Sequence, residues 1–318
     1  MSEYLQYGGQ AVIEGVMMRG PRFFAVACRR PDGSICVREE PVRSGALARA
    51  PFLNKPFVRG ALALFDAMAL GMRALSFSAQ VQTEAEQGSE PSSEAGRKAS
   101  ISDIAIGVTM VIAFAFGMGL FVALPTTLTQ LVQGALHINS PFLRNVTDGV
   151  LRIAIFMAYI SLISLMHNVR RVFQYHGAEH KAINTLEEQR DVTLTEALTS
   201  SRIHPRCGTS FIVVVLVVSI IVHSLLPRPE NALVRVALHL GLLPVIAGIA
   251  YEAIRFAGRR RGASALTVMM APGLWTQQIT TREPSPDQVE VALAALTAVM
   301  RMETGAPSAA PAEAAPGG

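Results

Sequence analysis

Long apolar runs are the dominant pattern along this chain. Two of them cover residues 101–124 and 146–166, and two more follow at 211–226, which is slightly short, and at 232–254. Each run approaches the roughly 20 residues that a helix needs to cross the hydrocarbon core of a bilayer. The pattern therefore predicts a mainly α protein, a polytopic membrane helical bundle of about four spans within residues 101–254.

A fifth apolar stretch, residues 57–79, carries charges at a regular interval. Arg59, Asp66 and Arg73 recur at intervals of seven, which places all three on one stripe of a helix. A charged stripe opposite an apolar face suits a helix that lies in the membrane interface. We predict an amphipathic interfacial helix over 57–82, with a re-entrant or spanning helix as the alternative.

The ends of the chain predict a small cytoplasmic α+β cap on the bundle. In residues 1–56, the β-prone runs FFAVACRR and SICVREEPV flank a Pro-Asp-Gly turn around Asp32, which is a signal of a β-hairpin. In residues 255–303, an irregular segment that includes PGLWTQQITTREP precedes a helix that Ser285 can cap. We expect these two parts to pack together on the cytoplasmic side.

Two further segments have compositions that do not support a packed core. Residues 83–100 are dominated by Ser, Glu and Gly, and residues 304–318 by Ala, Pro and Gly. Chains of this kind bury too little apolar surface to offset the entropy lost on ordering. We therefore predict a disordered connector before the first span and a disordered tail after the last helix.

The distribution of charge predicts which side of the membrane each segment occupies. Segments 1–100, 167–210 and 255–318 carry twelve, six and six Lys and Arg residues, whereas the loops 125–145 and 227–231 carry one each. The positive-inside rule therefore places both termini and the central loop in the cytoplasm. The net charge of +4 reflects these flanks and gives no reason to expect nucleic-acid binding.

Composition agrees with a protein of the cytoplasmic membrane. Half of the residues are hydrophobic and 16% are charged, against about 25% charged in an ordinary soluble domain. The first residues are polar and glycine-rich, so no cleavable signal peptide is visible. The three cysteines, Cys28, Cys36 and Cys207, fall on the predicted cytoplasmic side, where thiols stay reduced, and a disulfide framework is not expected.

The stretch YHGAEHKAIN in the central loop contains a match to HxxEH. On a helix His176 and His180 project from the same face and can bind one ion, while Glu179 lies beside them. In the inverted form of the HExxH arrangement two imidazoles hold zinc and the carboxylate acts as a base on water. The competing interpretation is an exposed polar helix without a metal.

The other end of the same loop offers two more ligand types. The run HPRCGTSF contains His204 and Cys207, and imidazole and thiolate both suit zinc. The predicted topology brings this run, the HxxEH and the cytoplasmic end of the last span to one face of the bundle. Glu252 at that end could be a ligand, an acceptor for a histidine N–H, or a partner for Arg255, and Glu14 could also join.

The residues leave two kinds of metal site open. If His176, His180, His204 and Cys207 all bind, the site is tetrahedral and closed, which is typical of structural zinc. If three of them bind and water takes the fourth position, Glu179 can deprotonate that water and the site is catalytic. A metal-free alternative makes Cys207 a nucleophile with His204 or His180 as its base.

A second polar cluster is expected on the outer side of the bundle. Asp148 and Arg152 are one helical turn apart, His223 lies on the third span, and Arg235 and His239 lie on the fourth. The cluster is either a structural ion-pair network or the outer end of a path for a substrate or proton.

The motifs GGQAVIEGVMMRGP, YHGAEHKAIN, HPRCGTSF and PGLWTQQITTREP together resemble the YqhQ-like family of bacterial membrane proteins. The resemblance runs from about residue 8 to residue 300. It implies a multi-pass protein of the bacterial inner membrane whose hallmark is the histidine-rich central loop. The family is described as metal-dependent enzymes, but the resemblance implies no particular substrate.

Taken together, the residues favour a zinc hydrolase acting at the cytoplasmic face of the membrane on a lipid-linked molecule or a membrane polypeptide. A non-catalytic scaffold or assembly factor with a structural metal or histidine cluster is the first alternative. A transporter or lipid-handling protein that uses the outer cluster is the second. Membrane lipid is an expected partner. A homo-oligomer or a cytoplasmic partner protein is compatible with each of these functions.

Overall fold

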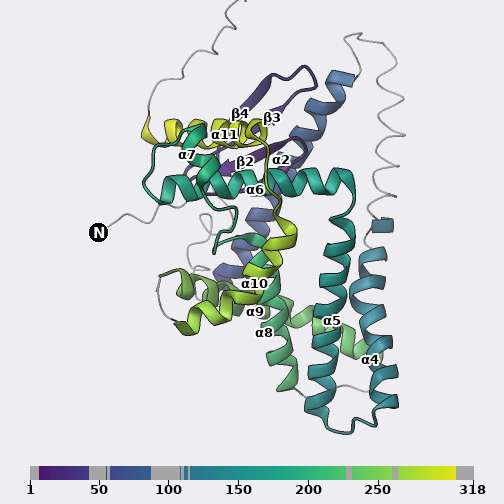
Figure 1. Cartoon of the computed structure of the whole chain (residues 1–318). Helices are drawn as coiled ribbons and strands as arrows, with labels where there is room; N and C mark the ends of the chain where they lie inside the picture. The colour runs from purple at the N-terminus through teal and green to yellow at the C-terminus, as the bar shows by residue number, and fades with distance from the viewer. Residues whose placement is uncertain are drawn as a thin grey trace, which may run out of the picture.

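The computed structural model is a mainly helical protein with one four-stranded antiparallel sheet (Figure 1). It describes residues 7–42, 55, 58–86, 108, 111–113, 115–226, 231–259 and 264–305. The predicted connector beyond residue 86, the start of the first predicted span up to residue 107 and the tail from residue 306 lie outside the described residues. The fold class predicted from the sequence is confirmed.

The sheet is built from two successive hairpins in the order β1-β2-β3-β4. Its strands are β1 (Gly8–Val12), β2 (Gly15–Arg19), β3 (Phe23–Arg29) and β4 (Ile35–Pro41). The predicted turn around Asp32 joins β3 to β4, and Gly33 takes the positive φ of 86° that this turn needs. The β1–β2 turn was not predicted. It contains Glu14, a non-glycine residue that adopts a positive φ of 51°.

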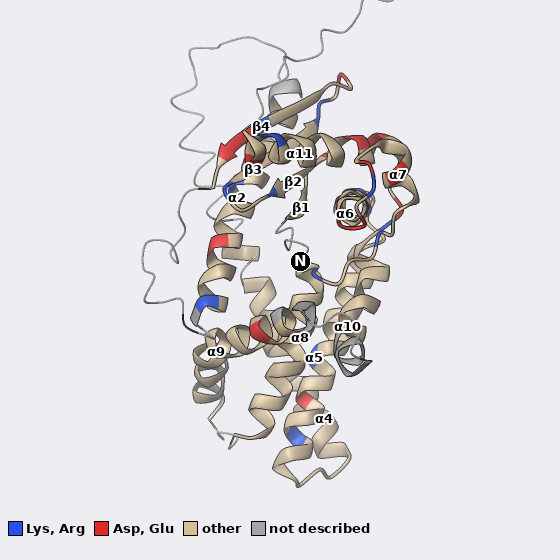
Figure 2. Cartoon of the chain, turned by 90° about the vertical axis from the view of Figure 1, so that its left-hand side faces the viewer, with Lys and Arg blue, Asp and Glu red and all other residues tan. Residues whose placement is uncertain are grey.

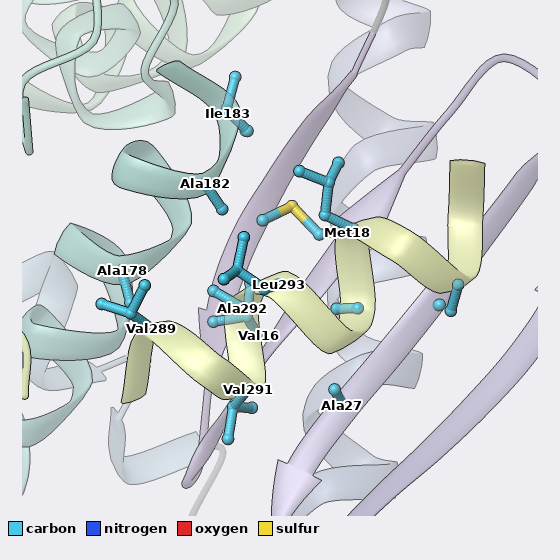
Figure 3. Packing of buried hydrophobic residues seen from close by; sticks show 14 of the residues in the cluster. Val16, Met18, Ala27, Ala178, Ala182, Ile183, Val289, Val291, Ala292 and Leu293 are labelled. Carbon is cyan, nitrogen blue, oxygen red and sulfur yellow. The ribbon is translucent and has the colours of Figure 1, made fainter. Parts of the chain in front are cut away.

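Helices cover both faces of the sheet. On one face, helices α6 (His167–Glu187) and α11 (Pro286–Thr304) pack on apolar side chains of β2 and β3, as Figure 3 shows. This core combines Ala178 and Ala182 of α6 with Val289 and Leu296 of α11. The start of α11 confirms the predicted cap, because Ser285 forms a capping box with Gln288.

The opposite face of the sheet packs on α2 (Val58–Glu86). Leu70, Ala74 and Val81 of this helix contact apolar residues of β1, β2 and β3. Near its start the helix packs on α9 (Ala232–Arg259), where a Cβ on Gly60 would lie 2.7 Å from Cβ of Tyr251. Helix α2 therefore connects the sheet to the apolar helices, and it continues past the predicted end at residue 82.

Three helices among the described residues are long and apolar enough to cross a membrane, judged by length and composition: Leu62–Thr83, Val111–Ala135 and Pro141–Ile163. The first is the stretch expected to lie in the interface. The second ends in the π-helical turn η2 (Gly119–Ala123) and α4 (Leu124–Ala135), and the third is α5 (Pro141–Ile163).

The remaining two predicted spans correspond to apolar helices that are shorter than the three candidate spans. They correspond to α8 (Gly208–Ser224) and to the segment Leu240–Ile254 of α9. Helix α10 (Ser264–Thr280) is also present where an irregular segment was expected, despite the internal Pro272. A Cβ on Gly273 would lie 2.7 Å from Cβ of Ser210, so close packing on α8 overrides the helix-breaking signal.

The layers differ in charge. Figure 2 shows Lys, Arg, Asp and Glu gathered over the sheet, α6, α11 and the short helix α7 (Leu194–Thr199), whereas α4, α5 and α8 are largely without them. Figure 1 shows that α6 turns away from the end of α5 and crosses above the apolar helices. Helix α6 therefore lies at the junction of the charged cap and the apolar bundle.

Candidate metal centre

Three potential ligand side chains converge where α6 meets the start of α8. His176 and His180 come from consecutive turns of α6, and Cys207 is the N-cap residue of α8. One ligand atom from each residue lies within 4.8 Å of the others, and this group could hold a metal ion. The sequence predicted all three residues.

Backbone carbonyls set the orientation of both imidazoles. Nδ1 of His176 lies 2.8 Å from the carbonyl oxygen of Thr280, and Nδ1 of His180 lies 2.7 Å from that of Arg202. A carbonyl oxygen only accepts, so each Nδ1 carries a proton and donates it. In the neutral imidazole, the lone pair of each ring is then on Nε2, the atom available to an ion.

The two Nε2 atoms have different surroundings. Nε2 of His176 lies 3.2 Å from Sγ of Cys207. Nε2 of His180 is buried and makes no well-formed hydrogen bond among the described residues, although the Cys207 side chain also interacts with this ring. Burial, the largest influence, lowers the pKa of His180 and so favours the neutral, metal-binding form of the ring. A buried nitrogen without a partner is costly in a folded protein unless a ligand occupies the site.

Glu179 lies in the same site and is 5% exposed. Its Oε2 atom is buried and has no hydrogen-bond partner among the described residues. Burial raises the pKa of the carboxyl above its usual range, while His176, His204 and the backbone N–H of Gly9 act in the opposite direction. The site thus contains a desolvated carboxylate beside two imidazoles and a thiol.

A cavity of about 480 Å³ opens beside these side chains. It is lined by His176, Glu179, His180 and Cys207 together with residues of β1, the start of α8 and the first half of α6. The site residues are therefore accessible to a ligand from one side, although each of them is at least partly buried in the fold.

His204 was predicted as a further ligand, but it lies outside the group that could hold an ion. Its Nδ1 accepts the backbone N–H of Arg206 at 3.3 Å, and its Nε2 lies 3.4 Å from Oε2 of Glu187. In this arrangement neither nitrogen offers a lone pair toward Cys207. His204 nevertheless lines the cavity, and its role as a ligand stays a prediction.

The two acidic residues considered for the site have other partners. Glu252 accepts two hydrogen bonds of 2.6 Å from Arg59, because α2 packs closely along α9. Glu14, in the β1–β2 turn, forms an ion pair with Arg171 and accepts from the hydroxyl of Tyr175 at 3.3 Å. Neither belongs to the group that could hold an ion. The side chain of Arg255, one of the partners considered for Glu252, lies outside the description.

The described part of the outer cluster is a local network. Nε of Arg152 donates to Asp148 at 2.9 Å, and Asp148 also accepts from Thr129 at 3.2 Å. The imidazole of His223 instead contacts the carbonyl oxygen of Ser219 on its own helix, at 2.8 Å from Nδ1. The side chains of the remaining two predicted members, Arg235 and His239, lie outside the description.

Sequence reasoning missed the residues that position the ligands. The carbonyl groups of Thr280 and Arg202 carry no side-chain signal, so no motif could have revealed them. Gly177 was a readable signal, because a glycine inside a helix usually has a packing reason. A Cβ there would lie 2.2 Å from the carbonyl oxygen of Arg282, so Gly177 lets α6 approach the segment after α10.

Comparisons with known proteins agree with the resemblance noted in the motifs. The family described as "Protein of unknown function (DUF1385)" matches residues 55–302. The chain is 34% identical over 308 residues to the "Uncharacterized protein YqhQ" of Bacillus subtilis (strain 168), covering 93% of each protein. No solved structure matches the chain. With most of its length matched by both, the chain belongs to the DUF1385 family.

Proposed function

We propose that this protein is a zinc-dependent hydrolase that works at the cytoplasmic face of the membrane. His176, His180 and Cys207 are the metal ligands, and Glu179 is the proton acceptor. The observation that carries the proposal is the shared orientation of the two imidazoles. Each Nδ1–H donates to a backbone carbonyl, which leaves both Nε2 atoms for one ion next to a cysteine sulfur.

The ligand types favour zinc over other common ions. Two imidazole nitrogens and one thiolate form a set of borderline and soft donors, which suits Zn²⁺ and does not suit Mg²⁺ or Ca²⁺. A ligating histidine commonly donates its other ring N–H to a carbonyl or carboxylate, as both histidines do here. Nε2 of His180, which is buried without a well-formed hydrogen bond among the described residues, gives a further reason to expect an ion.

The number of ligands supports a catalytic rather than a structural site. Zinc held by three protein ligands keeps a position for water and makes that water easier to deprotonate, whereas structural zinc is held by four. His204, the candidate fourth ligand, directs its Nε2 toward Glu187 instead. The adjoining cavity gives a substrate room beside the three ligands.

Glu179 is placed to take part in the proton transfers. In hydrolysis its carboxylate accepts a proton from water while the water oxygen forms a bond to the electrophilic carbon. The bond from that carbon to the leaving group then breaks, and Glu179 passes the proton to the leaving atom, so one water is consumed. Its raised pKa brings the carboxyl closer to the pH at which it must both accept and donate.

The location of the site supports a membrane-associated substrate. The cavity is lined by residues of the sheet, of α6 and of the first turns of α8, which is one of the apolar helices. The distribution of Lys and Arg supports a cytoplasmic location for this side. We therefore propose a lipid-linked molecule or a membrane polypeptide as the substrate.

Metal analysis and cobalt substitution test this function without knowledge of the substrate. Purified full-length protein should contain close to one zinc per chain, and His180→Ala should lose it. After exchange of zinc for Co²⁺, azide should change the visible absorption spectrum, because an open coordination position binds an added anion. Glu179→Gln should retain the metal and the azide response. Wild-type protein that binds no zinc would refute the proposal. If azide does not change the cobalt spectrum, the metal site is structural and not catalytic.

One contact favours a second candidate, a cysteine hydrolase without metal. Sγ of Cys207 lies 3.2 Å from Nε2 of His176, and the Thr280 carbonyl orients that ring, which is the arrangement of a nucleophile, a base and an orienting group. The sequence suggested His204 or His180 as the base, whereas the contact of 3.2 Å is made by His176. Alkylation by iodoacetamide separates the two candidates: bound zinc should protect Cys207, whereas a free nucleophile should react equally fast with and without zinc.

A further inference from the structure

The strand that borders the metal-centre cavity is an edge of the sheet. Strand β1 pairs with β2 and with no other strand among the described residues. The N–H of Arg29 donates to the carbonyl oxygen of Glu14 at 2.8 Å, which sets the alternation of bonds through the sheet. With the register Gly9↔Met18 and Ala11↔Val16, the backbone groups of Gly9 and Ala11 point outward.

Strand β1 also lines the cavity. The lining includes five consecutive residues from Tyr7 to Ala11, so the cavity runs along the strand instead of ending on a single side chain. The backbone N–H of Gly9 interacts with the Glu179 carboxylate. The outward groups of Ala11 have no hydrogen-bond partner among the described residues. Strand β1 therefore presents the outward backbone groups of Ala11, which have no partner among the described residues, beside the proposed catalytic residues.

The sequence of β1 permits this closeness. A Cβ on Gly9 would lie 3.1 Å from Cγ of Glu179 and 2.4 Å from the carbonyl oxygen of Met17, so any larger residue would push the strand away from α6. The lining also includes apolar side chains of the two helices, Val172 and Phe173 of α6 and Ile212 of α8. The cavity thus combines outward backbone groups of β1 with apolar side chains.

Resting on the proposed function, we infer that the substrate is an extended polypeptide segment that adds to the outer edge of β1 as a fifth strand. Free backbone groups in a row recognise another polypeptide backbone, and apolar walls accept its alternate side chains. Figure 2 shows β1 as the strand nearest to the apolar helices, which is where a segment leaving the membrane would arrive. A lipid would contact the apolar side chains but would leave the outward backbone groups of Ala11 unpaired.

The reaction is then hydrolysis of a peptide bond. The carbonyl carbon of the bound strand receives the water oxygen, and Glu179 takes the proton from that water. The C–N bond breaks, and Glu179 returns the proton to the amine nitrogen. One water is consumed, and the products are a carboxylate and an amine.

A proline scan of the two sheet edges tests the inference. Full-length, zinc-loaded protein in detergent micelles is given a random decapeptide library, with cleavage read by mass spectrometry. In a parallel assay, vesicles of phosphatidylethanolamine and phosphatidylglycerol are offered as the alternative, lipid substrate. Ala11→Pro removes one outward N–H and should slow peptide cleavage by about tenfold. The matched control Val37→Pro removes an outward N–H from β4, the other edge, and should cleave at the wild-type rate.

The second measurement changes the probe instead of the protein. The best-cleaved decapeptide is made in two versions, one with N-methyl groups on its odd-numbered backbone nitrogens and one with them on its even-numbered nitrogens. One version should no longer be cleaved, and the other should still be cleaved. This result is expected even if Ala11→Pro fails to fold, which zinc content and thermal unfolding will reveal. Equal cleavage of all methylated copies overturns the inference, as does zinc-loaded wild type that cleaves no decapeptide or hydrolyses only the vesicles. The proposed hydrolase fails separately, through absence of zinc or of the azide response.

Discussion

Replacing Gly177 with alanine tests how tightly α6 is held at the metal centre. The added Cβ would lie 2.2 Å from the carbonyl oxygen of Arg282, well inside van der Waals contact. The backbone cannot simply move away, because the N–H of Arg282 donates to the carbonyl oxygen of Phe173 at 2.8 Å. Overpacking costs about 1–3 kcal/mol, and the upper part of that range, about 2–3 kcal/mol, applies here because the contact is with a backbone atom that is held in place.

The helical propensity of alanine opposes that cost. Alanine is more favourable than glycine inside a helix by about 1 kcal/mol, so the net destabilisation should be about 1–2 kcal/mol. The melting temperature in detergent should therefore fall by about 2–8 °C. Zinc affinity should fall too, because Thr280, which orients His176, is two residues from the displaced Arg282.

The matched control is Gly134→Ala in α4, where a Cβ meets nothing within 4 Å. Its melting temperature should equal or exceed that of the wild type, since only the propensity effect remains. Thermal unfolding of the three proteins in one detergent gives the comparison. A Gly177→Ala protein as stable as the wild type would contradict the close packing of α6 against the segment after α10.

Three further changes examine the metal centre and the attachment of α2. Cys207→Ser should lower zinc affinity by more than tenfold by equilibrium dialysis, while His223→Ala on the same helix should not. Metal-free Glu179→Gln should melt higher than metal-free wild type at neutral pH, because burial raises the pKa of this carboxyl above 4.5. The stability that a raised pKa contributes is complete below pH 4.5 and is lost as the pH rises through the pKa of Glu179 in the folded protein. The difference in melting temperature between the two proteins should therefore vanish in acid. A difference that does not depend on pH would contradict the reasoning. Arg59→Gln should cost about 1–3 kcal/mol, and adding Glu252→Gln should recover part of it, whereas additive losses in the thermal double-mutant cycle would argue against the pair.

Features that depend on neighbouring residues could be predicted from the sequence. The hairpin around Asp32 has a glycine at the turn position that needs a positive φ, and the capping pattern at Ser285 marks the start of α11. The spacing of His176 and His180 identified the ligand pair, since residues four apart share a helix face. All of these signals act within one or two turns of the chain.

Features that depend on distant segments could not be predicted in the same way. The partner of Glu252 is Arg59, which is 193 residues away, and no local pattern connects them. The turn at Glu14 lacks the glycine that usually marks a positive φ. Helix α10 contains Pro272 and Gly273, which read as breakers, and only contact with α8 explains why it stays helical.

The carbonyl of Thr280 has a consequence for the way this protein is made. The ribosome completes His176, His180 and Cys207 long before it reaches residue 280, because synthesis runs from the N-terminus. Until α10 is made and docked, the ring of His176 lacks the acceptor that fixes its tautomer. A nascent or truncated chain therefore carries the candidate ligands before α10 supplies the acceptor for His176, and the final alignment of the site comes only after α10 has docked. Formation of the centre is thus tied to synthesis of the C-terminal part of the chain.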